Sequence, residues 1–477
     1  MFGLALSACG GGDSAGNGES PSPATNTAPV FTSPTTASTI ENANGPLLRV
    51  SANDAQANTI AFSIAGGADA SAFWLDTTGD LYFRTPPNYD LYSDANGDNV
   101  YEVLLEASDG KLSSRQALAI TVHNDREGIA VKRVATLGAS RAIASLEDGH
   151  LLAIGGSAGG IVQVNGATGQ SSVLHVFTDA DGRPANGITV LGLAYAYTFG
   201  PNKSLYVLKE KGGIASIACI HCWYSRHDLD VVEEDIADIS DGTAIILNRY
   251  QGFAYVAIGD KDGTHSQDTG AASHYGKIYN YPLDPDPLKG STPNYFDERV
   301  VGIGVRAPSG LTTLPGSRLA VADRGETFDE ISVTETFEGN NFGWPFYDGL
   351  RERNAGGAAL PGLVTPALIL AKGTGTHESR GIVAGLFYTG ARLSINNTYL
   401  FADKDGHIFT APWPQLADGG TLQANAIEIR DEDFKPDTGS IDKPVGFAID
   451  ALGDLYILDE DGELFRVDAP SPFEVLA

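Results

Sequence analysis

The sequence predicts an all-β chain in which an antiparallel β-sandwich is followed by a six-bladed β-propeller. Short strands of alternating apolar and polar residues fill positions 28–126, and one strand pair recurs six times in positions 127–470. No segment of helical periodicity competes with these strands. A chain of 477 residues also exceeds the size of one ordinary domain and should divide.

Positions 28–126 alternate between short β-like runs and turns rich in Gly, Asn, Asp and Pro. The clearest predicted strands are residues 60–64 (IAFSI), 79–83 (GDLYF) and 101–105 (YEVLL). A period of two places the apolar side chains on one face of each strand, as in a sheet with one buried side. This region is therefore predicted to be a sandwich of antiparallel strands.

A strand with an apolar centre recurs through the rest of the chain, and a second strand follows it each time. The first strands are predicted at residues 151–154, 205–208, 254–257, 319–322, 399–402 and 455–458. The second strands are predicted at residues 160–162, 213–215, 276–278, 329–331, 406–408 and 462–464. Six units at spacings of about 50 to 80 residues fit six propeller blades with inserted loops. Ligand-binding residues should then come from several blades whose loops meet around the central channel.

The charge of the chain limits its partners. It has 31 basic and 60 acidic residues, which gives a formal net charge of −29. Such a surface repels nucleic acids and anionic lipid headgroups, so nucleic-acid binding is not expected. Most of the acids are expected to be solvated surface groups, with calcium ligation as the alternative for a few of them.

The first residues join a short apolar run to Leu6-Ser7-Ala8-Cys9, which resembles the lipobox of bacterial lipoproteins. The resemblance implies a signal segment at residues 1–9, a lipid on Cys9 and a place in the bacterial cell envelope. Residues 10–27 are mostly small and polar, as expected of a flexible linker. No later run reaches the roughly 18 apolar residues of a membrane span, so contact with the membrane is expected only through Cys9.

Cys219 and Cys222 form a C-x-x-C pair. In an exported protein such a pair predicts a local disulfide, with a redox-active dithiol or a metal site as alternatives. Covalent haem would need a histidine directly after the second cysteine, and Trp223 stands there.

Acidic residues in the predicted sandwich occur in an order that resembles bacterial cadherin-like domains, a kind of immunoglobulin-like β-sandwich. The matching segments include APVF from Ala28, Asn88-Tyr89-Asp90 and Asn124-Asp125. The resemblance implies calcium binding by acids from separate loops at the ends of the sandwich. The positions that match the calcium ligands are Glu41, Asp54, Asp90, Asp109 and Asp125.

Positions 305–349 read VRAPSGLTTLPGSRLAVADRGETFDEISVTETFEGNNFGWPFYDG and resemble the glucose/sorbosone dehydrogenase family, whose members use pyrroloquinoline quinone (PQQ). The residues that fit the family pattern are Arg306, Pro308, Gly310, Gly325, Asp329, Glu330, Asn341, Gly343, Trp344 and Pro345. The residues that depart from it are Ala307, Arg324 and Glu326. The resemblance implies a propeller that binds PQQ and calcium and oxidises a sugar or another alcohol.

The resemblance also implies roles for single residues. Arg306 would lie near the quinone oxygens, and the carbonyls of Gly325 and Glu326 would face the cofactor calcium. A buried ion pair between Arg306 and Asp323 is the structural alternative. Lys404 falls near a family lysine that contacts the cofactor, with an exposed lysine between two aspartates as the alternative.

Three further positions matter to the same comparison. Asp329 and Glu330 match an acid pair at the family's structural calcium sites, and a hydrated turn before a strand is their alternative. The family holds the cofactor carboxylates with an Arg-x-Arg pair. The matching positions of this chain contain one cation, Lys443.

The family's catalytic base is missing at its expected place. The family has an Asp-His pair where this chain has Asp238-Ile239, and an isoleucine cannot accept a proton. His265 and His274 follow in an insertion near the same channel and are the candidate replacements, although a loop histidine without a catalytic role is the simpler interpretation. A shift in the alignment would bring His221 or His227 to this place instead.

Two functions remain open from the sequence. The first is a surface-anchored, calcium-binding PQQ sugar dehydrogenase that passes electrons to an acceptor. The second is a propeller that has lost its base and binds carbohydrate or protein at the cell surface without catalysis.

Overall fold

The computed structural model describes residues 25–156, 159–179, 181–197, 203–220, 232–240, 243–250, 253–269, 273–282, 299–334, 339–354, 360–390 and 393–468. The chain forms two compact units. The first consists of Met1–Asn88 and Asp94–His123, and the second of Tyr89–Ser93 and Asn124–Ala477. The predicted signal segment and Cys9 lie outside the described residues, as do His221 and His227.

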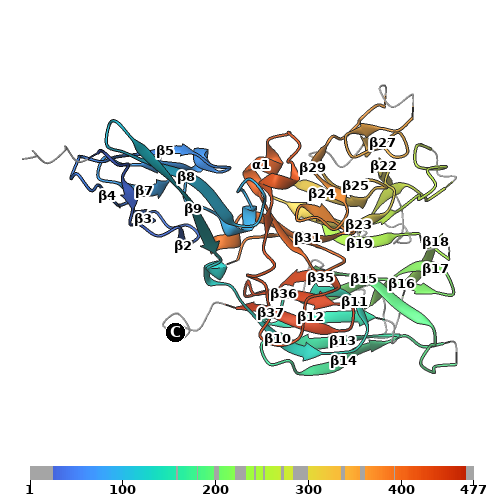
Figure 1. Ribbon diagram of the computed structural model, residues 1–477. Helices are drawn as coiled ribbons and strands as arrows, with labels where there is room; N and C mark the ends of the chain where they lie inside the picture. The colour runs from blue at the N-terminus through green and yellow to red at the C-terminus, as the bar shows by residue number, and fades with distance from the viewer. Residues whose placement is uncertain are drawn as a thin grey trace, which may run out of the picture. The chain divides into compact units, whose positions relative to one another are not determined.

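The first unit is built from β-sheets, drawn in blue in Figure 1. Its strands are β1 (Val30–Phe31), β2 (Thr36–Ile40), β3 (Leu48–Arg49), β4 (Ala52–Asn53), β5 (Ala61–Gly66), β6 (Phe73–Leu75), β7 (Asp80–Phe83), β8 (Val100–Ser108) and β9 (Ser113–His123). They form sheets in the order β2-β9-β8-β5, β3-β7-β6 and β1-β4. Alternate residues of β8 are buried, among them Val103 and Leu105. The strands predicted at 60–64, 79–83 and 101–105 are confirmed, while the cadherin-like assignment stays a prediction.

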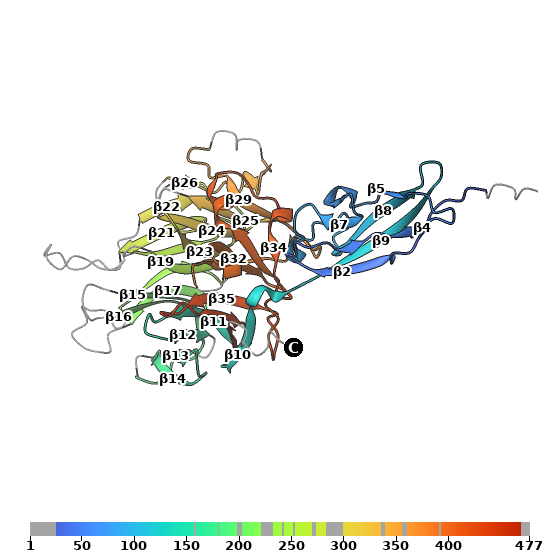
Figure 2. The same ribbon diagram turned by 90° about the vertical axis from the view of Figure 1, so that its left-hand side faces the viewer.

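The second unit contains six sheets of four or five strands (Figures 1 and 2). The first three sheets are β11 (Ser140–Ser145), β12 (Leu151–Gly156), β13 (Gly160–Asn165) and β14 (Ser171–Val176); β15 (Ile188–Tyr197), β16 (Lys203–Lys211), β17 (Ile214–Ile220) and β18 (Val232–Asp238); β19 (Ile245–Tyr250), β20 (Phe253–Ile258), β21 (Lys277–Pro282), β22 (Arg299–Ile303) and β26 (Asn340–Asn341). The other three are β23 (Pro308–Leu314), β24 (Arg318–Arg324), β25 (Phe328–Thr334), β29 (Pro366–Lys372) and β30 (Glu378–Ser379); β31 (Ile382–Tyr388), β32 (Thr398–Asp403), β33 (Ile408–Pro412) and β34 (Glu428–Ile429); β35 (Pro444–Ile449), β36 (Leu455–Asp459), β37 (Glu463–Asp468) and β10 (Ala130–Thr136).

These sheets close into a ring. The first strand of each sheet contacts the first strand of the next, in the order β11, β15, β19, β23, β31 and β35, and β35 contacts β11 again. The last sheet takes its outer strand from the beginning of the unit, because β10 pairs with β37 at Val131 and Val467. The described residues therefore form a six-bladed propeller closed by strands from both ends of the unit.

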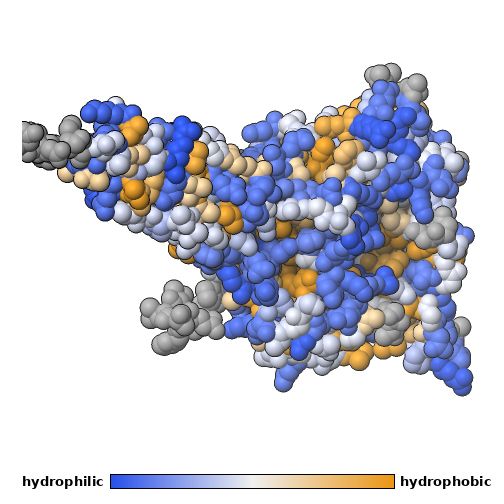
Figure 3. All heavy atoms as spheres, viewed as in Figure 1, coloured by the Kyte–Doolittle hydropathy of each residue, from blue (hydrophilic) through white to orange (hydrophobic). Residues whose placement is uncertain are grey.

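The six strand pairs predicted from the sequence are confirmed as the second and third strands of the six sheets. The second strands are the most buried; β32 and β36 are buried along their whole length. Apolar layers between neighbouring sheets make up the core, as in the layer that contains Phe401 and Phe409. Hydrophilic residues cover most of the face seen in Figure 3, and hydrophobic residues show as separate patches.

Two smaller features complete the fold. The hairpin of β27 (Tyr347–Asp348) and β28 (Arg351–Glu352) and the short helix α1 (Trp413–Ala417) are inserted between propeller strands. Cys219 forms a disulfide, and both other cysteines lie outside the described residues. The described residues include no helix with the length and apolar character that a membrane-spanning segment needs.

Candidate functional site

A cavity of about 550 Å³ lies at the end of the propeller where the innermost strands begin. Its walls include the first residues of these strands, such as Ile245 of β19, Ser309 of β23 and Val445 of β35. Five charged side chains from four different sheets and their turns also line it: Arg141, Arg324, Lys404, Lys443 and Glu460. We call it the cationic cavity, since four of these five residues carry positive charge.

Three of the four cations, Arg324, Lys404 and Lys443, form no ion pair within the described part of the chain. Arg324 Nε donates to the carbonyl of Ile382 at 2.8 Å. Gly381 lies against the stems of Arg324 and Lys404, because a Cβ there would be 3.2 Å from Lys404 Cδ. The nearby charge of Arg324, together with burial, lowers the pKa of the Lys404 amine. Positive charge is therefore concentrated on this wall.

The fourth cation pairs with the single acid of the cavity wall. Arg141 Nη2 lies 3.1 Å from Glu460 Oε1, and both side chains are about half exposed. Arg141 also lines the central channel, a space of about 470 Å³ that shares Ser309 and Val445 with the cationic cavity. The Arg141–Glu460 pair thus stands where the cavity meets the channel.

Ile239 lines the cationic cavity, at the place where the sequence comparison expected the base. Its backbone N–H donates to Gly213 O at 2.7 Å, and its side chain packs against the apolar layer that contains Ile258. Ile239, which stands at the position of the family's catalytic base, therefore lies on the wall of the candidate site. Neither His265 nor His274 lines this cavity.

The two candidate histidines have other contacts. The ring Nδ1 of His265 lies 3.2 Å from Asp268 Oδ2, and its backbone N–H donates to Asp260 Oδ2. The ring of His274 contacts the ring of Tyr279, with centroids 5.3 Å apart. None of these contact residues lines the cationic cavity.

Arg306 points at the turn that follows β24. Its Nη1 donates to the carbonyls of Arg324 at 2.9 Å and Gly325 at 3.0 Å, and its guanidinium lies 5.1 Å from the ring centroid of Trp344. The backbone N–H of Arg306, and not its guanidinium, binds Asp323 Oδ2 at 2.7 Å. Arg306 therefore donates to a carbonyl that the family comparison assigns to calcium, and it is not among the residues that line the cationic cavity.

The turn at Gly325 and Glu326 is held by Asp348. Asp348 accepts from the N–H groups of Glu326 at 3.0 Å and Thr327 at 2.8 Å. A Cβ on Gly325 would lie 2.0 Å from Asp348 Oδ1, so only glycine fits this position. The Glu326 carboxylate pairs with Arg353, whose Nη2 lies 2.6 Å from Glu326 Oε2.

Asp329 and Glu330 are neighbours on β25 and so point to opposite faces of the sheet. Asp329 Oδ2 accepts from Ser379 Oγ at 2.8 Å and Ile382 N at 2.9 Å. Glu330 Oε2 accepts from Gly349 N at 3.1 Å, and burial raises the pKa of Glu330 well above its usual value. The structure therefore does not bring the two side chains together, and a calcium role for either stays a prediction.

The five acids predicted from the cadherin-like resemblance are divided between the units. Glu41, Asp54 and Asp109 belong to the first unit, and Asp90 and Asp125 to the second. Asp109 accepts from the side chain of Asn26, and Asp54 accepts from the side chain of Asn58, which also donates to Asn26. Each acid also accepts from the backbone N–H two residues further on and so caps a turn. Asp125 accepts from Glu127 N in the second unit, and Asp90 contacts a buried arginine described below.

Sequence reasoning missed three residues of the cationic cavity: Arg141, Arg324 as a ligand-facing cation, and Glu460. Arg324 was seen only as a departure from the family pattern. Each of these residues lies at a strand end or in a turn, where no periodic signal marks a side chain as site-facing. Their common feature is charge next to the end of a predicted strand, and that signal alone would also select many surface residues.

Comparison with known proteins supports the fold. No protein-family model and no curated protein sequence matches the chain. The structure is similar to an aldose sugar dehydrogenase from Streptomyces coelicolor in its PQQ-bound form, with 18% identity, 72% of this chain and 98% of that chain covered, and a TM-score of 0.52. It is equally similar to the soluble aldose sugar dehydrogenase of Escherichia coli in its apo form, at 18% identity over 72% of this chain and 99% of that one, with a TM-score of 0.52.

A third similar structure is named as a glucose dehydrogenase, at 20% identity over 71% of this chain and 99% of that one, with a TM-score of 0.50. Identities this low show the fold. The propeller of this chain is of the kind found in PQQ-dependent sugar dehydrogenases.

Proposed function

We propose that the propeller binds a small ligand with one or more carboxylates in the cationic cavity. One observation carries this proposal: Arg324, Lys404 and Lys443 converge on one cavity without forming an ion pair among the described residues, in a chain whose net charge is −29. Cations held close together repel one another, and a bound carboxylate relieves that repulsion while it forms charge-assisted hydrogen bonds. Two ligands of this chemistry suit the fold, namely PQQ and an acidic sugar.

The residues fit one part of PQQ binding and not the rest. The cations would hold the carboxylates of PQQ. The aliphatic Ile239 stands where a base is needed, and Arg306 donates to Gly325 O where calcium is expected. Anion binding is therefore the function that the geometry supports best.

The direct test is calorimetric titration of the full chain with PQQ, with glucuronate and with glucose, each with and without calcium. We expect saturable binding of an anion and none of neutral glucose. PQQ binding with no response to glucuronate would identify a cofactor site, and the reverse would identify an acidic-sugar site. No binding of either anion at millimolar concentration would contradict the proposal.

Sugar oxidation with bound PQQ is the second candidate, and Glu460 favours it. When bound, PQQ would accept the two electrons of the sugar. Glu460 is the one carboxylate among the described residues that line the cationic cavity. Arg141 holds it at the mouth of the channel and would release it when a ligand carboxylate takes the guanidinium.

For this second candidate we expect Glu460→Gln to lower dye-linked sugar oxidation by roughly 100-fold or more, the range of general-base catalysis, and to leave PQQ affinity within about twofold. Glu432→Gln, an exposed acid that pairs with Lys435, is the control. Equal turnover of Glu460→Gln and the parent would remove Glu460 from the reaction. Absence of turnover in the parent would leave ligand binding as the function.

We further propose that the chain acts at the bacterial cell surface, anchored by a lipid on Cys9. The lipobox-like sequence and the polar linker support this proposal. Mass spectrometry of the native N-terminus tests it, because an unmodified or absent Cys9 would contradict it.

A further inference from the structure

Arg430 is a fully buried arginine that the proposed function does not use. It follows β34 in the second unit and is 1% exposed. Its backbone N–H donates to Ile408 O at 2.7 Å, which fixes the start of the side chain. A buried guanidinium has lost its hydration and needs compensation from acids and hydrogen-bond acceptors.

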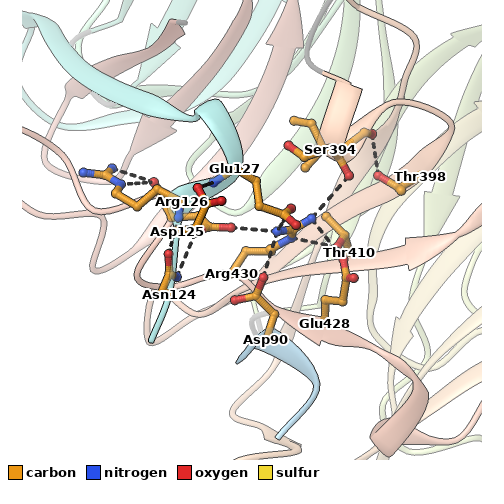
Figure 4. A network of polar contacts seen from close by, with 12 residues as sticks. Asp90, Asn124, Asp125, Arg126, Glu127, Ser394, Thr398, Thr410, Glu428 and Arg430 are labelled. Atoms are coloured by element: carbon orange, nitrogen blue, oxygen red, sulfur yellow. Dashed lines mark hydrogen bonds and ion pairs between the residues drawn. The ribbon is translucent and has the colours of Figure 1, made fainter. Parts of the chain in front are cut away.

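Figure 4 shows the acids and hydrogen-bond acceptors around the Arg430 guanidinium, and three of the carboxylates contact one atom, Nη1. Arg430 Nη1 lies 2.7 Å from Asp90 Oδ2, 2.6 Å from Glu127 Oε2 and 2.7 Å from Asp433 Oδ2. The second nitrogen, Nη2, lies 3.2 Å from Glu428 Oε2. Four carboxylates thus surround a single cation.

The arrangement around Nη1 is that of oxygens around a metal ion. The ligand oxygens of Asp90, Glu127 and Asp433 all lie within 4.8 Å of one another. Nη1 carries only two N–H groups, so it cannot donate one hydrogen bond along a separate axis to each of the three carboxylates. Calcium binds carboxylate oxygens at about 2.3 to 2.6 Å, close to the distances found here. The oxygens are therefore arranged about a point of positive charge.

The local electrostatics fit the same description. Burial by itself would lower the pKa of the Arg430 guanidinium, but Glu428, Asp90, Glu127 and Asp433 together raise it above its usual value. Burial raises the pKa of Asp433, and Arg430 opposes that effect. The charge of Arg430 thus offsets part of the effect of burial on Asp433.

The backbone is also adapted to deliver one of these ligands. Arg126 and Glu127 in the 3-10 helix η3 (Arg126–Gly128) have φ values of +55° and +45°. Side-chain-bearing residues in this region cost roughly 1 to 2 kcal/mol each, and such strain persists where the surroundings require it. The Arg126 guanidinium binds the carbonyls of Asp433 and Lys435, so η3 is tied to the segment that carries Arg430.

We propose that the Arg430 guanidinium fills a divalent-cation site, so that the chain's own cation joins three segments that a calcium ion would otherwise join. The segments are Tyr89–Ser93, η3 and residues 427–434, all within the second unit. The native chain takes no calcium at this place. Removal of the guanidinium opens the site to calcium. This proposal does not depend on the function of the cationic cavity.

The test compares thermal unfolding of the full chain after EDTA treatment and after addition of calcium at matched ionic strength. Arg430→Ala leaves room for an ion among three carboxylates that have lost their shared cation. We expect its melting temperature to fall by about 10 °C in EDTA, because unpaired buried charges are strongly destabilising, and calcium to recover more than half of the loss. Arg430→Lys, which keeps a cation, should lose less in EDTA and recover less with calcium.

The double variant Arg430→Ala/Asp433→Asn is the matched control and should lose the calcium-dependent recovery. A stable Arg430→Ala protein whose melting temperature ignores calcium would overturn the proposal. Calcium binding to the unmodified chain and to Asp433→Asn gives a second readout if Arg430→Ala does not fold. Equal stoichiometry supports the proposal, and loss of one bound calcium in Asp433→Asn would overturn it.

Discussion

Replacing both unpaired lysines of the cationic cavity is expected to weaken anion binding by at least 100-fold. In the Lys404→Gln/Lys443→Gln variant the cavity keeps its size but loses two of four cations. A hydrogen bond to a charged group contributes about 1.5 to 3 kcal/mol, so two such losses remove roughly 3 to 6 kcal/mol. Calorimetric titration with the anion that binds the parent measures the effect.

Lys435→Gln serves as the control, because Lys435 is exposed, pairs with Glu432 and does not line the cavity. Binding to the parent should also weaken with added salt, while the residual binding of the double variant should respond less. An unchanged affinity in the double variant would show that the ligand binds elsewhere.

A loss of stability as large as that of Arg430→Ala is expected from Gly310→Ala, at the contact between two innermost strands. A Cβ on Gly310 of β23 would lie 1.8 Å from Cβ of Ala384 on β31. Neither strand can move away freely, since each also contacts a strand on its other side in the closed ring. Overpacking of this kind costs about 3 kcal/mol, which corresponds to a fall in melting temperature of roughly 6 to 12 °C.

The double variant Gly310→Ala/Ala384→Gly exchanges the two side chains and should recover most of the loss. Gly420→Ala is the control, because a Cβ there meets nothing within 4 Å. Thermal unfolding by circular dichroism measures all three variants. If Gly310→Ala melts with the parent, the two innermost strands do not approach as closely as the structure has them.

Local pattern was sufficient for the strands of the fold. The second strands β12, β16, β20, β24, β32 and β36 have central residues buried on both faces, so each is a continuous apolar run that can be recognised in the sequence. The innermost strands carry weaker signals, because small residues such as Gly310 and Ala384 interrupt their apolar runs. The edge strand β10 could not be assigned to the last sheet, since its partner β37 lies more than 300 residues away.

The candidate site was predicted only in part. The motif at 305–349 and the missing base at Ile239 were found from the sequence, and Ile239 does line the cationic cavity. The roles taken from the family did not all fit, because Arg306 donates to the turn carbonyls. Asp90 was expected beside calcium and contacts Arg430, whose position in the sequence gives no sign of that partner.

The sequence by itself determined the all-β character, the six strand pairs and the acidic surface, because each depends on residue type and short-range periodicity. Only the tertiary structure decided which charges meet. Arg141, Arg324, Lys404 and Lys443 come from separate blades, and ring closure brings their strand ends together. The fold also brings Asp90 and Glu127 from distant segments to Arg430, beside Glu428 and Asp433 of its own segment. These contacts join residues that are far apart in the sequence, so no local pattern predicts them.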